Sequence, residues 1–357
     1  MRSSLSPAAS VHGRTVSSSP RAAQESNKPA TMCIAQHLLL ASTLGLACAA
    51  HAAVRDHTAA PLNAAEQALM QGRIDEAVAS LQHIVSTHPD DGPAYLLLCR
   101  SFYAEEHQDE AISACENAVR TLPRSSDAFD WMGRAYGMKA SHAGPFAGFS
   151  LARKVRTAFE TAVQLDPNNA PAVNDLSEFY INAPGIVGGG QDKAVDLANR
   201  TQATLPQVAH RIRAMLADKH KDYDEAERQF KAAVDDAHHA DAWVDLGAFY
   251  MRRNQPDQAV AALKQCLAAD HAKDASLVDV ASILNSRHLE PQLAQHVLEE
   301  YLRSPARSDA APVIKVHVML AKMLAAAGDK PAAKIEVDKA LALASGYAPA
   351  KQALREL

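Results

Sequence analysis

Arg100 and Arg134 stand at matching places in two similar stretches of sequence, 34 residues apart (134 − 100). Guanidinium groups form forked hydrogen bonds with carboxylates, so two neighbouring arginines could bind an acidic group on a peptide. Asp130 and Glu178 are near enough to neutralise both arginines internally, which is the competing interpretation. The full set of candidate partner-binding residues on these helix faces is Leu96, Arg100, Tyr103, Asp130, Arg134, Asn174, Glu178 and Asn182.

Cys99 and Cys115 are a second pair of residues that could do chemistry. In an oxidising compartment they could form a disulfide that closes a loop of about 16 residues, which the chain-entropy account values at roughly 3 kcal/mol. We expect two buried thiols at small-residue positions, with the disulfide as the alternative. Cys266 also falls at a small core position and is interpreted as structural.

The sequence holds no grouping typical of catalysis. The histidines do not fall in H-E-x-x-H or another metal-ligand spacing, and no Ser/His/Asp or Cys/His set stands out. A glycine-rich run at residues 185–190 has the spacing of a phosphate-binding loop, but Gln191 and Asp192 replace the Lys and Ser/Thr that phosphate and magnesium need. We therefore predict no enzyme activity, no cofactor and no metal site, and interpret the glycines as a widened turn.

Recurring helices must position these residues. The clearest copy of the repeat is Trp243-x2-Leu246-Gly247-x2-Tyr250, followed by small and large residues at Ala259 and Leu263. Prolines at 89 and 123 are one period of 34 residues apart (123 − 89), each after a predicted helix end, where proline cannot continue the helix. Large side chains on the first helix of each unit then need small ones on the second, which alanines supply.

This pattern resembles the tetratricopeptide repeat family over about 300 residues, in its exported bacterial form. The resemblance implies an all-α, right-handed superhelical solenoid of about eight antiparallel helix pairs. It also implies that the first helices line a concave groove where proteins or peptides bind. The spacing departs from the period at two places, and we predict enlarged turns at about 137–150 and 183–190.

The N-terminal part does not follow the repeat. We predict a disordered extension at 1–31, a signal peptide at 32–52 cleaved after Ala52, a linker at 53–60 and the solenoid at 61–357. The signal assignment depends on basic residues, a short apolar run at 38–50 and a small-x-small ending. It predicts a periplasmic or secreted protein. A lipoprotein signal at Cys48 and a mitochondrial transit peptide are alternatives, and Met32 is a second candidate start.

Charge and composition limit the classes of partner that we expect. The net charge is −5, and removing residues 1–52, with four bases and one acid, leaves 32 bases and 40 acids, a net charge of −8. No basic block remains to bind a phosphate backbone, so we predict no nucleic-acid partner. No apolar run in the mature chain reaches the roughly 20 residues of a membrane span.

These observations favour a non-enzymatic scaffold that binds a protein or an extended peptide in the groove of a helical solenoid. The alternative is a small-ligand or substrate-capturing accessory protein of a transport or envelope assembly system, with the enlarged turns forming a pocket.

Overall fold

The computed structural model describes residues 59–237, 240–270 and 272–357, apart from the side chain of Pro145. The predicted extension at 1–31, the signal peptide at 32–52 and Cys48 lie outside these residues. Residues 59 and 60, which we assigned to the linker at 53–60, already belong to the first helix. All of the structure below belongs to one compact unit, Arg55–Leu357.

The described residues form helices and no strand. In chain order they are a helix at residues 59–70, α2 (Ile74–Thr87), α3 (Gly92–Ala104), α4 (Gln108–Thr121), α5 (Ser126–His142), α6 (Pro145–Leu165), α7 (Ala170–Asn182), the short 3-10 helix η1 (Gly185–Val187), α8 (Gln191–Thr201), α9 (Pro206–Lys219), α10 (Tyr223–Ala237), α11 (Ala240–Arg252), α12 (Pro256–Ala269), α13 (Ser276–Ser286), α14 (Pro291–Arg303), α15 (Val313–Ala326), α16 (Lys330–Leu343) and α17 (Ala348–Glu356). None of these helices is both long and apolar enough to cross a membrane.

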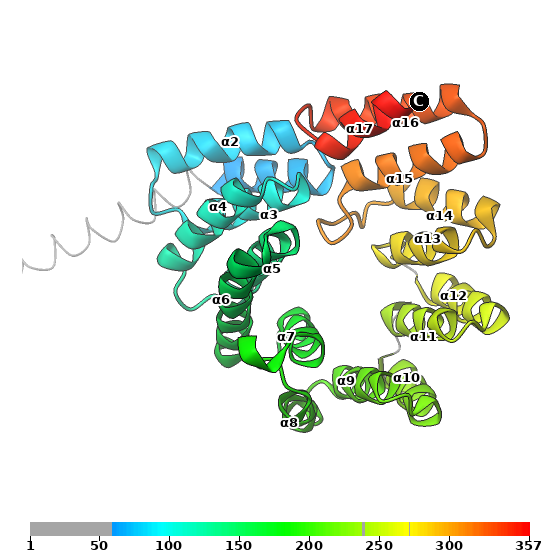
Figure 1. Ribbon diagram of the computed structural model, residues 1–357. Helices are drawn as coiled ribbons and strands as arrows, with labels where there is room; N and C mark the ends of the chain where they lie inside the picture. Colours follow the sequence, from blue (N-terminus) through cyan, green and yellow to red (C-terminus); the bar gives the residue numbers. More distant parts are fainter. Residues whose placement is uncertain (1–58, 238–239, 271) are drawn as a thin grey trace, which may run out of the picture. The chain divides into compact units, whose positions relative to one another are not determined.

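The helices pack in pairs (Figure 1). We call the first helix of each pair its A helix and the second its B helix. From α3 to α13, each A helix also contacts the A helix of the next pair. There are eight pairs in the described part of the chain, from the helix at 59–70 with α2 to α15 with α16, and α17 follows as a single helix. The prediction of an all-α solenoid of about eight helix pairs is confirmed.

Close contact inside a pair depends on small residues, as the repeat pattern predicts. A Cβ atom on Gly247 in α11 would lie only 2.8 Å from Cδ2 of Leu263 in α12. A Cβ atom on Gly133 in α5 would lie even closer to the ring of Phe159 in α6. A larger residue at either position would force the two helices apart, because the interior leaves no spare volume.

Buried tyrosines tie neighbouring pairs together. Tyr136 donates a hydrogen bond to Glu116 of the preceding B helix at 2.7 Å. The same contact recurs in the next pair, between Tyr180 and Glu160. It recurs again three pairs after the first, between Tyr250 and Glu227. Burial of the tyrosines and the hydrogen bond to the glutamate raise the tyrosine pKa at all three places. The tyrosine that ends the W-x2-L-G-x2-Y pattern is therefore a core residue that also forms a hydrogen bond to the preceding repeat.

The turn expected at about 137–150 is helical, which corrects the prediction. α5 continues to His142 and α6 begins at Pro145, so only residues 143 and 144 separate them. The extra residues lengthen both helices, to 17 and 21 residues. Alanine and lysine in this stretch are good helix formers, and the proline takes the first turn of α6, where its missing N–H is harmless.

The connection between α7 and α8 spans residues 183–190 and contains η1. Gly188 adopts a φ of 98°, which glycine tolerates and other residues rarely do. Its carbonyl accepts a hydrogen bond from Lys193 Nζ at 2.8 Å, and the Gly190 N–H bonds to the carbonyl of Tyr180. The glycines thus serve a wide turn folded against its own helices, as we interpreted them.

The last pairs pack against the first ones. Apolar residues of the helix at 59–70 and of α2 share one core with residues of α15, α16 and α17. Figure 1 shows α17 beside α2. The Ser345 N–H donates to the Asp75 carboxylate at 2.9 Å, and Lys315 pairs with Glu106 at 3.3 Å. The resemblance implied a groove along the A helices, but it gave no indication that the two ends of the array meet.

Candidate binding surface on the A helices

All eight predicted partner-binding residues lie on three consecutive A helices. Leu96, Arg100 and Tyr103 belong to α3, Asp130 and Arg134 to α5, and Asn174, Glu178 and Asn182 to α7. The structure divides them into two groups with different surroundings. The first lies around α3 and α5, and the second around α7, α9 and α11.

In the first group, both predicted arginines lie over the ring of Trp131. The guanidinium carbons of Arg100 and Arg134 are 5.7 and 4.7 Å from the ring centroid, and the ring of Tyr103 meets it edge-on at 5.3 Å. Both predicted arginines therefore contact the same indole ring. Trp131 was missed from the sequence, although it precedes Arg134 by three residues and so shares its helix face. We call Arg100, Tyr103, Trp131 and Arg134 the tryptophan cluster.

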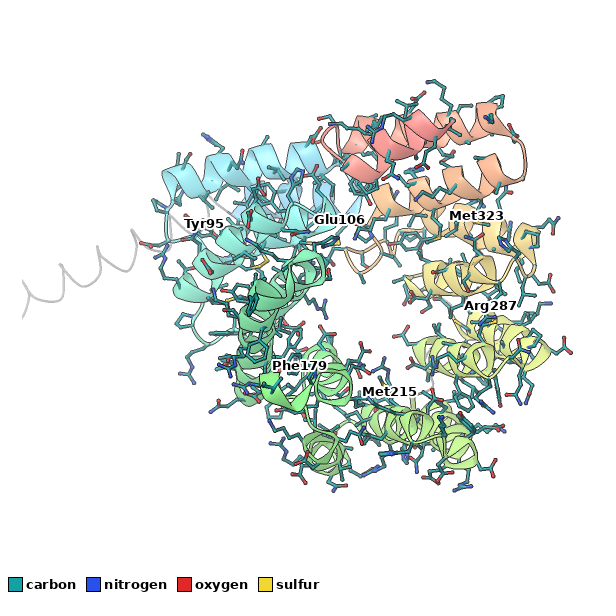
Figure 2. The ribbon with its side chains drawn as sticks, in the orientation of Figure 1. Tyr95, Glu106, Phe179, Met215, Arg287 and Met323 are labelled. Atoms are coloured by element: carbon teal, nitrogen blue, oxygen red, sulfur yellow. A yellow bond between two sulfur atoms is a disulfide. The ribbon has the colours of Figure 1, made fainter. Side chains whose placement is uncertain are left out.

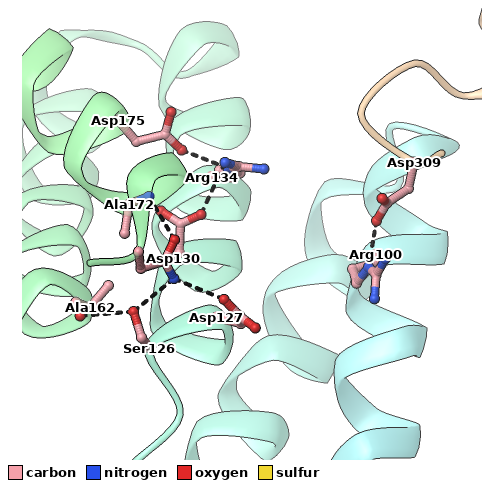
Figure 3. Close-up of polar contacts among 10 residues, drawn as sticks. Arg100, Ser126, Asp127, Asp130, Arg134, Ala162, Ala172, Asp175 and Asp309 are labelled. Atoms are coloured by element: carbon pink, nitrogen blue, oxygen red, sulfur yellow. Dashed lines mark hydrogen bonds and ion pairs between the residues drawn. The ribbon is translucent and has the colours of Figure 1, made fainter. Parts of the chain in front are cut away.

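Arg134 is neutralised within the chain. Its guanidinium is 2.6 Å from the Asp175 carboxylate and 3.0 Å from that of Asp130 (Figure 3). Asp130 is only 3% exposed, so it lies beneath the surface instead of facing a partner as we predicted. Burial raises its pKa to about 7; Arg134 opposes this shift and the neighbouring Asp175 adds to it. One Asp130 oxygen, Oδ1, has no hydrogen-bond partner among the described residues.

Arg100 is also neutralised, by an acid far along the sequence. Its Nε donates to the carboxylate of Asp309, which belongs to the connection between α14 and α15 (Figure 3). Glu66 approaches the same guanidinium to 4.0 Å. Internal neutralisation of both arginines was the competing interpretation, and the structure confirms it with different partners. Asp130 contributes as expected, whereas Glu178 pairs with another arginine.

That arginine is Arg211 of α9, which organises the second group. It contacts Glu178 of α7 at 2.6 Å and Asp245 of α11 at 2.8 Å, and it lies 3.4 Å from the Asn174 side chain. Burial alone would lower the Arg211 pKa, but the two carboxylates outweigh it and the pKa is raised. Arg211 thus joins three consecutive A helices.

A sequence signal for Arg211 and Asp245 existed but was not used. The two residues are 34 apart, one repeat period. The pair of Arg252 and Asp218 on the same helices has the same separation, at 2.9 Å. Opposite charges one period apart on A helices therefore indicate ion pairs between neighbouring repeats.

Two cavities flank the Arg211–Asp245 pair. One of about 470 Å³ lies toward the C-terminal ends of α7 and α11, and its lining includes Glu178 and Asn182. The other, of about 410 Å³, includes Asn174 and the acidic side chains of Asp241 and Asp279. Three predicted residues of α7 thus line open space, unlike Asp130. Figure 2 marks Phe179 and Met215 on the helices beside these cavities.

The 410 Å³ cavity is acidic on its α11 and α13 side. Burial, together with the nearby carboxylates of Asp241, Asp245 and Asp274, raises the pKa of Asp279 to about 6. Burial likewise raises the pKa of Asp245, against the effect of Arg211. Among the described residues, no three His, Cys, Asp or Glu side chains are grouped closely enough to hold a metal ion.

Cys99 and Cys115 form a disulfide between α3 and α4, which overturns our preference for two free thiols. Their Cα atoms are 5.0 Å apart, within the range that a disulfide spans. Both residues are fully buried, at the contact between the two helices. Cys266 is a free, buried cysteine, as expected.

Comparison with known proteins gives two family matches. Residues 219–278 match the family described as tetratricopeptide repeat, and residues 41–126 match the one described as bacterial transcriptional activator domain. The second match begins outside the described residues. No curated protein matches the sequence significantly.

The following solved structures have similar folds and are distant in sequence. A thermophilic tetratricopeptide repeat protein of Thermus thermophilus is 18% identical, over 63% of this chain and 97% of that one, with a TM-score of 0.43. Yeast Tom70 is 16% identical, over 79% and 59%, with a TM-score of 0.47. A tetratricopeptide repeat protein from Parabacteroides merdae is 14% identical, over 70% and 92%, with a TM-score of 0.41. The described residues form eight helix pairs, and the stretch at residues 219–278 is similar to the tetratricopeptide repeat family.

Proposed function

We propose that the chain is a non-enzymatic scaffold that binds a protein or an extended peptide along its A helices. The observation that carries the proposal is the pair of cavities, of about 470 and 410 Å³, that share Arg211 and Asp245 as lining residues. Because the cavities lie on either side of one ion pair, an extended polypeptide could place neighbouring side chains in both. In such interfaces a few anchoring residues supply most of the affinity.

The charges along these helices favour a polar partner. Carboxylates of Glu178, Asp245 and Asp218 alternate with the guanidiniums of Arg211 and Arg252. Such alternation can pair with charged side chains of either sign and donate or accept hydrogen bonds along a peptide backbone. The described lining of the two cavities offers few large apolar side chains, so specificity would come from hydrogen bonds and charge.

We further propose that the protein acts outside the cytoplasm. The predicted signal peptide at 32–52 supports this location. The disulfide between Cys99 and Cys115 adds support, because structural disulfides persist mainly in oxidising compartments. Mass spectrometry of the mature N-terminus from cell fractions tests it: a chain that begins at Ala53 in the periplasm is expected, and an uncleaved cytoplasmic chain contradicts it.

The match of residues 41–126 favours a second candidate, a part in a transcriptional activator. The net negative charge argues against a direct contact with DNA, so such a part would be played through protein contacts. Fluorescence anisotropy with a labelled DNA duplex at low salt tests the argument from charge. Salt-sensitive binding would contradict that argument and favour this candidate over the scaffold.

Selection of displayed random peptides against the full chain tests the scaffold proposal. We expect peptides that bind wild type and bind at least about tenfold more weakly to an Arg211→Ala/Asp245→Ala variant, which removes both charges together. The matched control is Arg228→Ala/Glu225→Ala, an ion pair on the surface of the B helix α10. Peptides that bind both variants like wild type would contradict the proposed surface. Native mass spectrometry that retained a small molecule, without any selectable peptide, would favour the small-ligand alternative.

A further inference from the structure

We infer that residues 304–312 act as an internal ligand of the tryptophan cluster, and that an acidic segment of a partner protein displaces them. This inference rests on the proposed function, because it assigns partner chemistry to one end of the same A-helix surface. The segment connects α14 to α15 and reaches α3, which is more than two hundred positions earlier in the sequence.

The segment is held in a defined shape by a tyrosine. Tyr301 is fully buried, and its hydroxyl accepts a hydrogen bond from the Ser308 N–H at 3.0 Å. The same hydroxyl donates to the Ala311 carbonyl at 2.8 Å. These bonds fix the backbone on both sides of Asp309. The loop therefore holds the Asp309 side chain in place for its contact with α3, as in a preorganised ligand.

The contact itself has the features of peptide recognition. The Asp309 carboxylate accepts a hydrogen bond from Arg100 Nε, and the two side chains are only 11% and 18% exposed. The Arg100 guanidinium also lies over the ring of Trp131. A planar guanidinium that rests on an aromatic ring and receives a carboxylate is a strong, geometrically specific contact. The chain thus shows, with its own aspartate, which chemical group this position accepts.

A second contact covers the neighbouring predicted residue. Lys315, in the first turn of α15, pairs with Glu106 at 3.3 Å and places its ammonium 5.8 Å from the ring centroid of Tyr103. Figure 2 labels Glu106 at this end of α3. Two of the predicted partner-binding residues, Arg100 and Tyr103, are therefore already engaged by the C-terminal part of the same chain.

Release of Asp309 does not require the ends of the array to separate. The ends are joined by an apolar core to which the helix at 59–70, α2, α15 and α16 all contribute, and Gly72 also lies close to the side chain of Val313. The hydrogen bond from Ser345 to Asp75 adds to that contact. The charged contact at Arg100 stands beside this core, so an external carboxylate can replace Asp309 while the apolar contact persists.

Binding of a fluorescein-labelled hexaglutamate peptide to the full chain tests the inference. If Asp309 occupies Arg100 for nine tenths of the time or more, then Asp309→Ala is expected to tighten the apparent affinity at least about tenfold over wild type. Adding Arg100→Ala should return the binding to the weak level. Hexaglutamine is the uncharged control peptide, and Asp338→Ala, at an exposed aspartate of α16, is the control variant.

A spectroscopic readout locates the peptide. The chain has two tryptophans, so Trp243→Phe leaves Trp131 alone, and its emission should change when hexaglutamate binds the Asp309→Ala protein. Asp309→Asn is the second variant if alanine impairs folding, and it should bind the peptide with intermediate affinity. Equal affinity of the folded wild-type and Asp309 variants would overturn the inference. The proposed function would then still stand if selected peptides depended on Arg211 and Asp245.

Discussion

Arg100 and Arg211 lie on A helices three pairs apart, and their guanidinium groups are neutralised by carboxylates from different parts of the chain. Each is a half-buried guanidinium that meets carboxylates. The partners of Arg211 come from the adjacent pairs, Glu178 before it and Asp245 after it. The partner of Arg100 is Asp309, which lies 209 residues later. In the middle of the array the charge stabilises stacking of neighbours, whereas at its end the charge holds a distant part of the chain.

The two regions also differ in the space that they leave for a partner molecule. The Arg211–Asp245 pair is flanked by cavities of about 470 and 410 Å³. Around Arg100 the space is taken by the chain's own loop and by Lys315. We therefore expect the middle of the array to bind partners directly and the end to bind them only in competition with residues 304–312. Substitutions confined to one region measure how independent the two are.

The largest effect is expected from the disulfide, which ties only the Arg100 region. Cys99→Ala/Cys115→Ala should lower the free energy of unfolding by about 3 kcal/mol, because the unfolded chain regains the freedom of a 16-residue loop. Urea unfolding without reductant measures the change. Cys266→Ala in α12 is the control and should have a smaller effect. Alkylation of both cysteines in the untreated protein would show that the tie does not form.

A packing change should act on the middle of the array alone. Gly247→Leu is expected to lower the free energy of unfolding by about 1–3 kcal/mol, since the added side chain collides with Leu263. Thermal unfolding measures the loss, and hexaglutamate binding to the Asp309→Ala background should not change. Gly144→Ala is the matched control, because no described atom outside its two chain neighbours lies within 4 Å of the new Cβ. An unchanged melting temperature for Gly247→Leu would mean that α11 and α12 adjust at no cost.

Loss of each arginine compares the two regions directly. Arg211→Ala should lower the free energy of unfolding by about 1–2 kcal/mol, because it leaves two carboxylates without their cation. Arg100→Ala leaves chiefly Asp309 unpaired and should have an effect of about 1 kcal/mol or less. Chemical denaturation of both variants gives the ranking. A larger loss for Arg100→Ala would show that the ends of the array are held more by charge than by their apolar core.

The smallest effect is a dependence on pH at the border between the two regions. The pKa of Asp130 is raised from 3.8 to about 7 in the folded protein, so the folded state binds this proton more tightly than the unfolded state. Its contribution to stability is therefore complete below about pH 4 and is lost as the pH rises through about 7. An asparagine side chain at this position is neutral throughout, so Asp130→Asn should reduce the fall in melting temperature between pH 5 and pH 8 by roughly 2 °C.

Asp338→Asn, at an exposed aspartate, is the control for this measurement. Wild type and Asp130→Asn with the same fall in melting temperature would contradict the assignment of the proton to Asp130. A larger fall in Asp130→Asn would reverse the sign and point to a carboxylate that is stabilised by Arg134 more than it is destabilised by burial.

The fold could be predicted from sequence because the repeat pattern is local. Gly247, Tyr250 and Leu263 fix one helix pair, and the other pairs form the same kind of helix hairpin with fewer matching residues. The pair of Arg211 and Asp245 was equally accessible, since it spans one period. The contact of Arg100 with Asp309 was not, because no periodicity relates α3 to a loop 209 residues away. The burial of Asp130 also escaped prediction, because the repeat gives a helix face but not the depth at which each side chain lies.

The meeting of the first and last helix pairs has a consequence for how the molecule comes apart. Linear arrays of repeats usually fray from their termini, where an end repeat has only one neighbour. Here the helix at 59–70 and α2 share a core with α15 and α16, so each terminal pair has a neighbour on both sides. Opening must then begin by breaking two interfaces at once, wherever it starts. We expect hydrogen exchange to show similar protection in the terminal and middle helices, in place of the usual gradient toward the ends.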